Sequence, residues 1–134
     1  MLNTVLLWPA IAQTALILLA YVELGRARSG AVRAGKVRDT DFAPSSEPPE
    51  SAAGRRLVAN QFELPLLFFV VVGYLILIDG VSVIELLLAW LFVAARAVHL
   101  VASVALHLKA RHLSFMVGFL VVVALWADLA LRLV

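Results

Sequence analysis

The chain has 134 residues, of which 63% are hydrophobic and 15% charged, and its mean hydropathy is +1.01. Soluble globular proteins carry about 45–50% apolar and about 25% charged residues. Because a chain this short cannot bury so much apolar surface inside itself, the composition excludes a soluble globular domain. It also excludes a disordered chain, which would have low hydrophobicity. The formal net charge is +2, and the absence of cysteine excludes disulfides, thiolate metal sites and cysteine nucleophiles.

The first predicted element is a membrane-spanning helix over about residues 2–24. Met1 to Val22 contains no charged residue, and 22 helical residues extend about 33 Å, enough to cross a hydrocarbon core of about 30 Å. The segment lacks both a basic region before its apolar run and a small-residue cleavage site. We therefore expect a retained helix rather than a signal peptide.

A polar loop follows over about residues 25–55. Twelve of the twenty charged residues lie between Glu23 and Arg56, and the prolines and serines near residue 45 predict a mobile aqueous segment. The first half of this segment can prolong the first helix into solvent for a few turns. Three further spans are expected at about 57–78, 81–108 and 113–133, joined by a tight turn at Asp79-Gly80 and a polar connection at Lys109–His112.

These elements predict an all-α integral membrane four-helix bundle that forms one domain over residues 1–134. The first loop together with Arg56, which follows it directly, holds seven of the eleven Lys and Arg residues, so the positive-inside rule places this loop in the cytoplasm and both termini outside. Membrane topology then explains the excess of basic over acidic residues, and we expect no nucleic-acid partner.

Two polar stripes cross the expected second and third spans. Arg56, Asn60 and Glu63 have the i, i+4, i+7 spacing of one helix face, and Pro65 is expected to kink the helix beside them. The third span carries Arg96, His99, Ser103 and His107 on another stripe, with Arg111 and His112 following at the same end. Ionisable groups inside a span usually face a bundle interior or a cavity.

Structural and functional explanations are both open for these residues. Glu63 and Arg96 can pair across helices and Asn60 can add an interhelical hydrogen bond, whereas the whole set favours a polar ligand site. His99 and His107 are out of phase on a helix, so we expect no metal site. Asp128 and Arg132 have the spacing of a local i, i+4 salt bridge, and Lys109 can anchor its helix at lipid headgroups.

The ligand that suits such a site is a small anion that also carries a cation or amide donors, bound beside an apolar second substrate. An arginine near a thiol lowers the pKa of that thiol and so activates it as a nucleophile.

The same residues carry a resemblance to the MAPEG family, the membrane-associated proteins of eicosanoid and glutathione metabolism. Residues 56–65 resemble the family's R-x-x-x-N-x-x-E-x-P signature in its bacterial form. Arg96 and His99 resemble the R-x-x-H of its third helix, and Arg111 with Phe115 looks like the arginine and aromatic that open its fourth.

The resemblance implies a homotrimer that holds glutathione, as co-substrate, between neighbouring subunits. It implies glutathione-dependent transferase or peroxidase activity on lipophilic electrophiles from the membrane. Arg56, Asn60 and Glu63 would hold the glutathione backbone, Arg96 and His99 would contribute to the pocket, and Arg111 would stabilise the thiolate. His99 and Ser103 stand where eicosanoid-forming members carry tyrosines, which argues against prostaglandin or leukotriene synthesis.

The alternative is a non-catalytic membrane protein whose polar residues cement an oligomer or bind a lipid.

Overall fold

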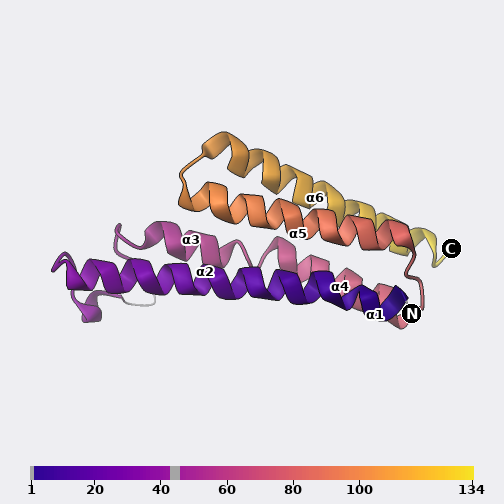
Figure 1. Ribbon diagram of the computed structural model, residues 1–134, viewed down its shortest axis with the longest axis horizontal. Coiled ribbons are helices and arrows are strands. Elements are labelled where there is room, and N and C mark those ends of the chain that lie inside the picture. Colours follow the sequence, from indigo (N-terminus) through magenta and orange to yellow (C-terminus); the bar gives the residue numbers. More distant parts are fainter. Residues whose placement is uncertain (1, 43–45) are drawn as a thin grey trace.

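The computed structural model describes residues 2–42 and 46–134, and its regular elements are helices (Figure 1). In chain order they are α1 (Leu2–Val5), α2 (Leu7–Arg33), the 3-10 helix η1 (Asp39–Asp41), α3 (Ala52–Ala59), α4 (Leu64–Leu77), α5 (Val83–Val104) and α6 (Leu108–Leu131). Within the described residues, four helical stretches are long and apolar enough to cross a membrane: Asn3–Arg33, Ala52–Leu77, Val83–Val104 and Leu108–Leu131. The expected all-α, four-span architecture is confirmed, whereas the Ala43–Ser45 part of the expected loop lies outside the described residues.

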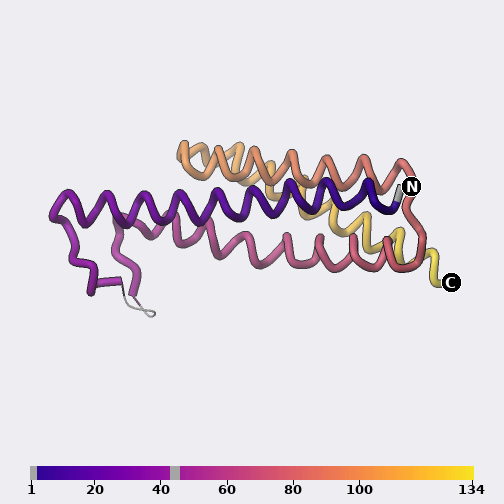
Figure 2. The backbone as a smooth tube through the Cα atoms, turned by 60° about the horizontal axis from the view of Figure 1, so that its bottom comes forward, coloured from indigo at the N-terminus to yellow at the C-terminus, as the bar shows by residue number. Residues whose placement is uncertain are grey.

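The helices form an elongated bundle whose connections alternate between its two ends. The start of α1, the turn after α4 and the end of α6 lie at one end, and the described residues 34–42 and 46–51 and the α5–α6 turn lie towards the other (Figures 1 and 2). The core is apolar and lies between α4, α5 and α6. At its centre the rings of Phe68 and Phe92, both fully buried, stack with centroids 4.2 Å apart.

The first helix continues beyond the expected span, as the sequence allowed. The 27 residues of α2 extend about 40 Å, so the helix is longer than the hydrocarbon core is thick. It ends where Gly35 adopts a left-handed conformation with φ 67°, and Lys36 N–H donates back to the Ala31 carbonyl at 3.1 Å. A glycine in this conformation is a common way to end a helix, because it has no Cβ to clash.

The described part of the first loop is fastened to α2 and α3 by an ionic cluster. Arg28 donates from Nε and Nη2 to both carboxylate oxygens of Glu47, at 2.9 and 2.5 Å. Ser51 Oγ also donates to Glu47 at 2.6 Å, and Arg55 Nη1 lies 3.9 Å from the same carboxylate. The Phe42 ring covers the Arg28 guanidinium at 5.2 Å. This part of the loop therefore has fixed contacts with the bundle.

The second span is broken rather than only kinked. Helix α3 ends at Ala59, and α4 begins at Leu64 with Pro65 in its first turn. Proline has no N–H and fits the first turn of a helix, so it favours a new start at this point. The expected single helix face through Arg56, Asn60 and Glu63 is therefore interrupted at Asn60.

The turn between α5 and α6 lies earlier in the chain than the sequence suggested. Helix α5 ends at Val104 and α6 begins at Leu108, so Lys109–His112, expected to be a connection, forms the first turns of α6. The chain reverses through Leu106, which has a positive φ of 59°. A left-handed leucine is uncommon, and the polar residues after it resemble a loop by composition alone.

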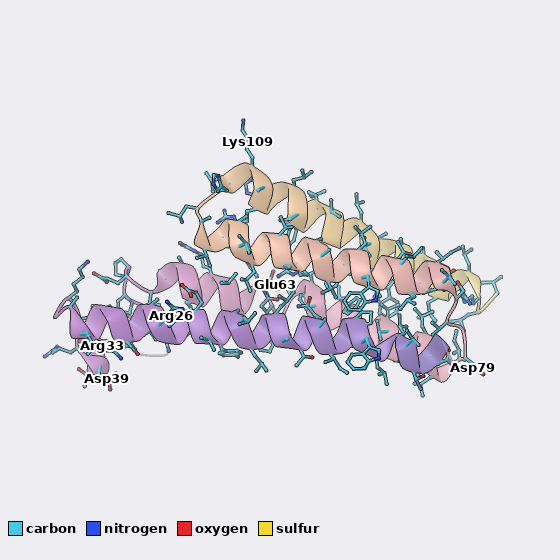
Figure 3. All side chains as sticks on the ribbon, viewed as in Figure 1. Arg26, Arg33, Asp39, Glu63, Asp79 and Lys109 are labelled. Atoms are coloured by element: carbon cyan, nitrogen blue, oxygen red, sulfur yellow. The ribbon has the colours of Figure 1, made fainter. Side chains whose placement is uncertain are left out.

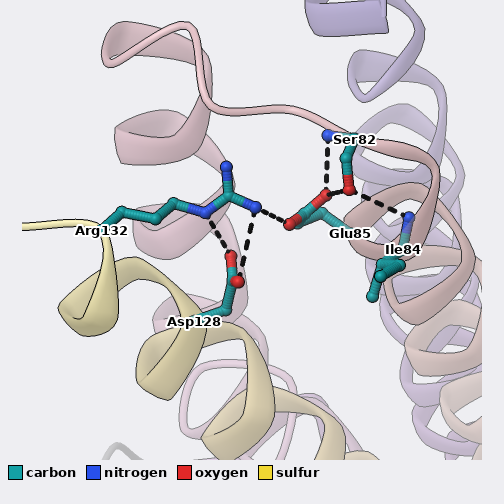
Figure 4. A network of polar contacts seen from close by, with 5 residues as sticks. All are labelled: Ser82, Ile84, Glu85, Asp128 and Arg132. Carbon is teal, nitrogen blue, oxygen red and sulfur yellow. Dashed lines mark hydrogen bonds and ion pairs between the residues drawn. The ribbon is translucent and has the colours of Figure 1, made fainter.

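The opposite end of the bundle is closed by a second ionic network (Figure 4). Ser82 caps α5 by accepting from Ile84 N–H at 3.2 Å, and the Ser82 N–H donates to Glu85 at 2.7 Å. Arg132 donates from Nε to Asp128 at 2.7 Å and also pairs with the buried Glu85. The predicted Asp128–Arg132 salt bridge is confirmed, and Glu85 extends it from α6 to α5.

Candidate functional site

The break in the second span exposes backbone groups, and Arg96 fills part of this gap. Arg96 is fully buried on α5, and its Nη2 donates to the Asn60 carbonyl at 3.2 Å. This carbonyl belongs to the C-cap residue that follows α3, where carbonyls lack intrahelical partners. The Arg96 Nε and Nη1 atoms are buried without a hydrogen-bond partner in the chain. Arg96 therefore joins the second and third spans and keeps two free donors.

A second polar pair crosses the same break on its other side. Gln13 of α2 donates from Nε2 to Gln61 Oε1 at 3.2 Å, and both side chains are buried. The remaining polar atoms of this pair, Gln13 Oε1 and Gln61 Nε2, have no partner in the chain. The sequence offered one signal for Gln13, an amide inside an otherwise apolar span, but nothing in it identified Gln61 as the partner.

His99 and Arg111 are brought together by the early turn into α6. His99 Nδ1 lies 3.1 Å from the Arg111 carbonyl, and because a carbonyl only accepts, Nδ1 carries the proton in this bond. The Ser114 hydroxyl donates to the same carbonyl at 3.0 Å, and the Phe115 ring lies 6.1 Å from the imidazole. His99 Nε2 is buried and has no partner in the chain.

The other sequence-predicted site residues lie nearer the surface. Arg56 and Glu63 are exposed, and Asn60 and Arg111 are partly exposed. Glu63 lies at the break, halfway along the bundle (Figure 3). Among the described residues Glu63 and Arg96 do not form an ion pair within 4 Å, so the cross-helix pairing considered from the sequence is absent in the single chain.

A cleft of about 210 Å³ lies nearer the loop end, between α2, α3 and the end of α5. Glu23, Gly54, Leu57 and Ser103 are among its lining residues, whereas the six predicted site residues are not. One chain thus forms two contacts between predicted residues, Arg96 with Asn60 and His99 with Arg111. The six residues do not line this cleft.

The arrangement offers three kinds of group to a polar ligand at membrane depth. The guanidinium groups can bind carboxylates or a thiolate, the Glu63 carboxylate can accept from an ammonium or amide, and His99 Nε2 can accept a proton or a hydrogen bond.

Comparison with known proteins gives one match. The sequence model of the MAPEG family matches residues 5–131, nearly the whole chain. The search of curated proteins found no match, and neither did the search of solved structures.

Proposed function

Since this chain belongs to the MAPEG family, we propose that it is a glutathione-dependent transferase or peroxidase that acts on lipophilic electrophiles and works as a homotrimer. The observation that carries the proposal is the polar break in the second span, where Asn60 and Arg96 meet and the guanidinium keeps two unpaired nitrogens.

The exposed charges of a single chain support an oligomer. Arg56 and Glu63 are exposed on a stretch that can cross a membrane. Ionisable side chains at membrane depth usually face a protein interior or a water-filled cavity rather than lipid. A neighbouring subunit that covers this surface would shield both side chains and enclose a ligand beside them.

Glutathione has the chemistry that these groups complement. It is a tripeptide with two carboxylates, one ammonium and two amides. In the proposed complex Arg56 binds a carboxylate, Glu63 accepts from the ammonium or an amide, and the Asn60 side chain bonds the peptide backbone. Arg96 and His99 lie behind this surface and contribute through the Asn60 and Arg111 carbonyls that they bind.

Arg111 is the proposed catalytic residue. Its guanidinium stabilises the thiolate of glutathione and so lowers the pKa of the thiol. In the transferase reaction the thiolate sulfur attacks an electrophilic carbon, a carbon–sulfur bond forms, and the leaving group departs with its electron pair. In the peroxidase reaction the sulfur attacks the terminal oxygen of a hydroperoxide, the oxygen–oxygen bond breaks, and the lipid alcohol is released after protonation. The glutathione sulfenic acid formed in this step then reacts with the thiol of a second glutathione, which gives glutathione disulfide and water. The second substrate reaches the site from the bilayer.

The orientation that we propose places the 34–51 segment in the cytoplasm and both termini outside. The basic residues of the first loop support it, and cytoplasmic glutathione would then reach the loop half of the bundle.

The test combines binding and turnover with a matched pair of arginines. Purified protein is titrated with glutathione by calorimetry, and turnover is measured with a chlorinated aromatic and a lipid hydroperoxide. Arg56→Ala is expected to weaken binding at least tenfold, because a charged hydrogen-bond partner contributes about 1.5–3 kcal/mol. Arg55→Ala is the control, since Arg55 is also exposed but faces Glu47. No binding and no turnover by the unmodified protein would refute the proposal.

Arg111→Ala tests the catalytic role separately. The thiolate absorbance of bound glutathione should disappear while light scattering still reports a trimer. Loss of the trimer would instead identify Arg111 as a structural residue.

The alternative function, a non-catalytic membrane protein, has an observation in its favour. The hydrogen bonds of Arg96 and His99 join helices of the same chain. Residues whose only role is to stabilise helix packing would make such bonds. Intact helices and trimer in the absence of glutathione binding would favour this alternative.

A further inference from the structure

Arg111 lies near the start of α6, where the helix has few stabilising features of its own. The residue before the helix, His107, makes no side-chain cap hydrogen bond, and Leu106 before it has a left-handed backbone. Lysine and arginine in the first turns of a helix are also unfavourable, because the first N–H groups carry partial positive charge. The start of α5, in contrast, is capped by Ser82. The position of Arg111 therefore depends on contacts with another helix.

His99 supplies such a contact from α5. Its Nδ1 donates to the Arg111 carbonyl at 3.1 Å, across the turn that joins the two helices. The Ser114 hydroxyl donates to the same carbonyl at 3.0 Å, but Ser114 belongs to α6, so its bond does not join α6 to α5. The hydrogen bond from His99 thus ties the backbone of Arg111 to the third span.

The rest of the His99 ring does not reach the surface. Only 3% of the residue is exposed, and Nε2 is buried without a partner in the chain. The titratable groups that face the ring are basic, namely Arg96 on the same helix and Arg111 and His112 on α6. A second proton on the ring would add a charge beside these groups. His99 is therefore a neutral imidazole that can act on the site through the Arg111 backbone.

We propose that His99 is a positioning residue for Arg111. By holding the Arg111 carbonyl, it keeps the guanidinium where it stabilises the thiolate of glutathione. This inference rests on the proposed function and deepens it, because it assigns His99 to the ionisation of the thiol and not to contact with glutathione. Binding of the glutathione backbone by Arg56, Asn60 and Glu63 would then not depend on His99.

Three substitutions separate the two nitrogens of the ring. Asparagine carries its amide nitrogen at the place of Nδ1, so His99→Asn keeps a donor for the Arg111 carbonyl. Glutamine carries its amide near the place of Nε2, so His99→Gln loses that donor. His99→Leu removes both polar groups. Each purified variant is titrated with pH while ultraviolet absorbance measures the thiolate of bound glutathione.

The ionisation of the thiol should follow the donor at Nδ1. In His99→Gln and His99→Leu the ratio of thiolate to thiol at a given pH should fall about 2- to 10-fold, the effect of one hydrogen bond on an equilibrium. His99→Asn should match the unmodified protein. Calorimetry with S-methylglutathione, which has no thiol to ionise, should give the same affinity for all variants. A residue that only stabilised the bundle would not separate ionisation from binding in this way.

Hydrogen–deuterium exchange measures the anchor without glutathione. The amides of residues 111–114, in the first turns of α6, should exchange about 2- to 10-fold faster in His99→Gln and His99→Leu. They should exchange at the native rate in His99→Asn.

Trp126→Phe is the matched control. Trp126 Nε1 donates to the Leu67 carbonyl at 3.2 Å, so it also joins two helices through a ring N–H and a backbone carbonyl. It lies in the second half of α6, and phenylalanine keeps an aromatic ring without the donor. The thiolate ratio of Trp126→Phe should equal that of the unmodified protein. An equal fall in Trp126→Phe and His99→Leu would indicate a general loss of packing and overturn the inference.

Two further results would overturn it. One is an unmodified protein that forms the thiolate together with His99→Gln and His99→Leu variants that form as much. The other is retention of the thiolate in His99→Gln and its loss in His99→Asn, because Nε2 would then act directly. If His99→Leu does not fold, the comparison of His99→Asn with His99→Gln decides the question. An unmodified protein that binds no glutathione would instead refute the proposed function, and this inference with it.

Discussion

Replacing Glu47 by glutamine tests whether the ionic cluster holds the loop on the bundle. In the native chain the carboxylate receives two hydrogen bonds from Arg28 and one from Ser51. A hydrogen bond with a charged partner contributes about 1.5–3 kcal/mol. Because about a third of the Arg28 side chain is exposed, solvent screening lowers the expected loss to about 1–2 kcal/mol. The released form of the loop should then become about 5 to 30 times more populated.

Hydrogen–deuterium exchange in detergent micelles measures this population. The backbone amides in the 46–51 stretch, which are those of Ser46, Glu47, Glu50 and Ser51 because prolines carry no N–H, should exchange faster in Glu47→Gln by the same factor. Asp41→Asn is the control, because Asp41 hydrogen-bonds Arg38 within its own turn, and the amides of residues 46–51 should be unaffected by it. Unchanged exchange of residues 46–51 in Glu47→Gln would refute the reasoning.

The same cluster predicts a pH dependence with a definite sign. The hydrogen bond from Arg28, with further contributions from Ser51 and Arg55, lowers the pKa of Glu47 from 4.5 to about 2. Because this pKa is lower when the loop is held than when it is released, the stabilisation is complete above pH 4.5. It should be lost as the pH falls from 4.5 towards 2. Glu47→Gln should remove this dependence.

Two further predictions concern packing, and both are measured by unfolding in mixed detergent micelles followed by circular dichroism. Gln13→Leu or Gln61→Leu alone should destabilise the protein by about 1–3 kcal/mol, because the partner amide stays buried without a hydrogen bond. The double variant should be nearly neutral, because neither amide remains. Equal losses of stability in the single and double variants would contradict this prediction. Gly54→Ala places a Cβ 3.1 Å from the Leu24 Cα and should cost about 1–3 kcal/mol. A Cβ added at Gly73 has no neighbour within 4 Å, so Gly73→Ala should be neutral or stabilising by up to about 1 kcal/mol. Similar losses of stability at both glycines would refute the close approach of α2 and α3.

The positions of the four spans could be predicted from the sequence, because each span is a long apolar stretch with few charged residues. Long apolar stretches and the charged first loop are properties of composition, and they indicated four helices. The turn at Leu106 could not be predicted, because leucine gives no sign of a left-handed backbone and the polar residues after it resemble a loop. At Pro65 the sequence indicated a distortion, but the extent of the break depends on the Arg96 contact with the Asn60 carbonyl.

The residues of the candidate site could be predicted from the sequence, but most of the contacts between them could not. Intramembrane charges are conspicuous in so apolar a chain, so Glu63, Arg96 and Arg111 could be selected directly. Their contacts depend on how the helices pack, and helical spacing within one span says nothing about that. The pairing of His99 with the Arg111 backbone follows from the early start of α6, and Gln13 has a partner 48 residues away.

The break in the second span also constrains the order of events during biogenesis. Helix α3 has 8 residues and α4 has 14, so they extend about 12 and 21 Å, and neither alone crosses a hydrocarbon core of about 30 Å. Open backbone groups are not tolerated against lipid. We therefore expect the nascent segment to enter the membrane as one continuous helix. It would open at Asn60 only after α5, synthesised later, brings Arg96 to the freed carbonyl.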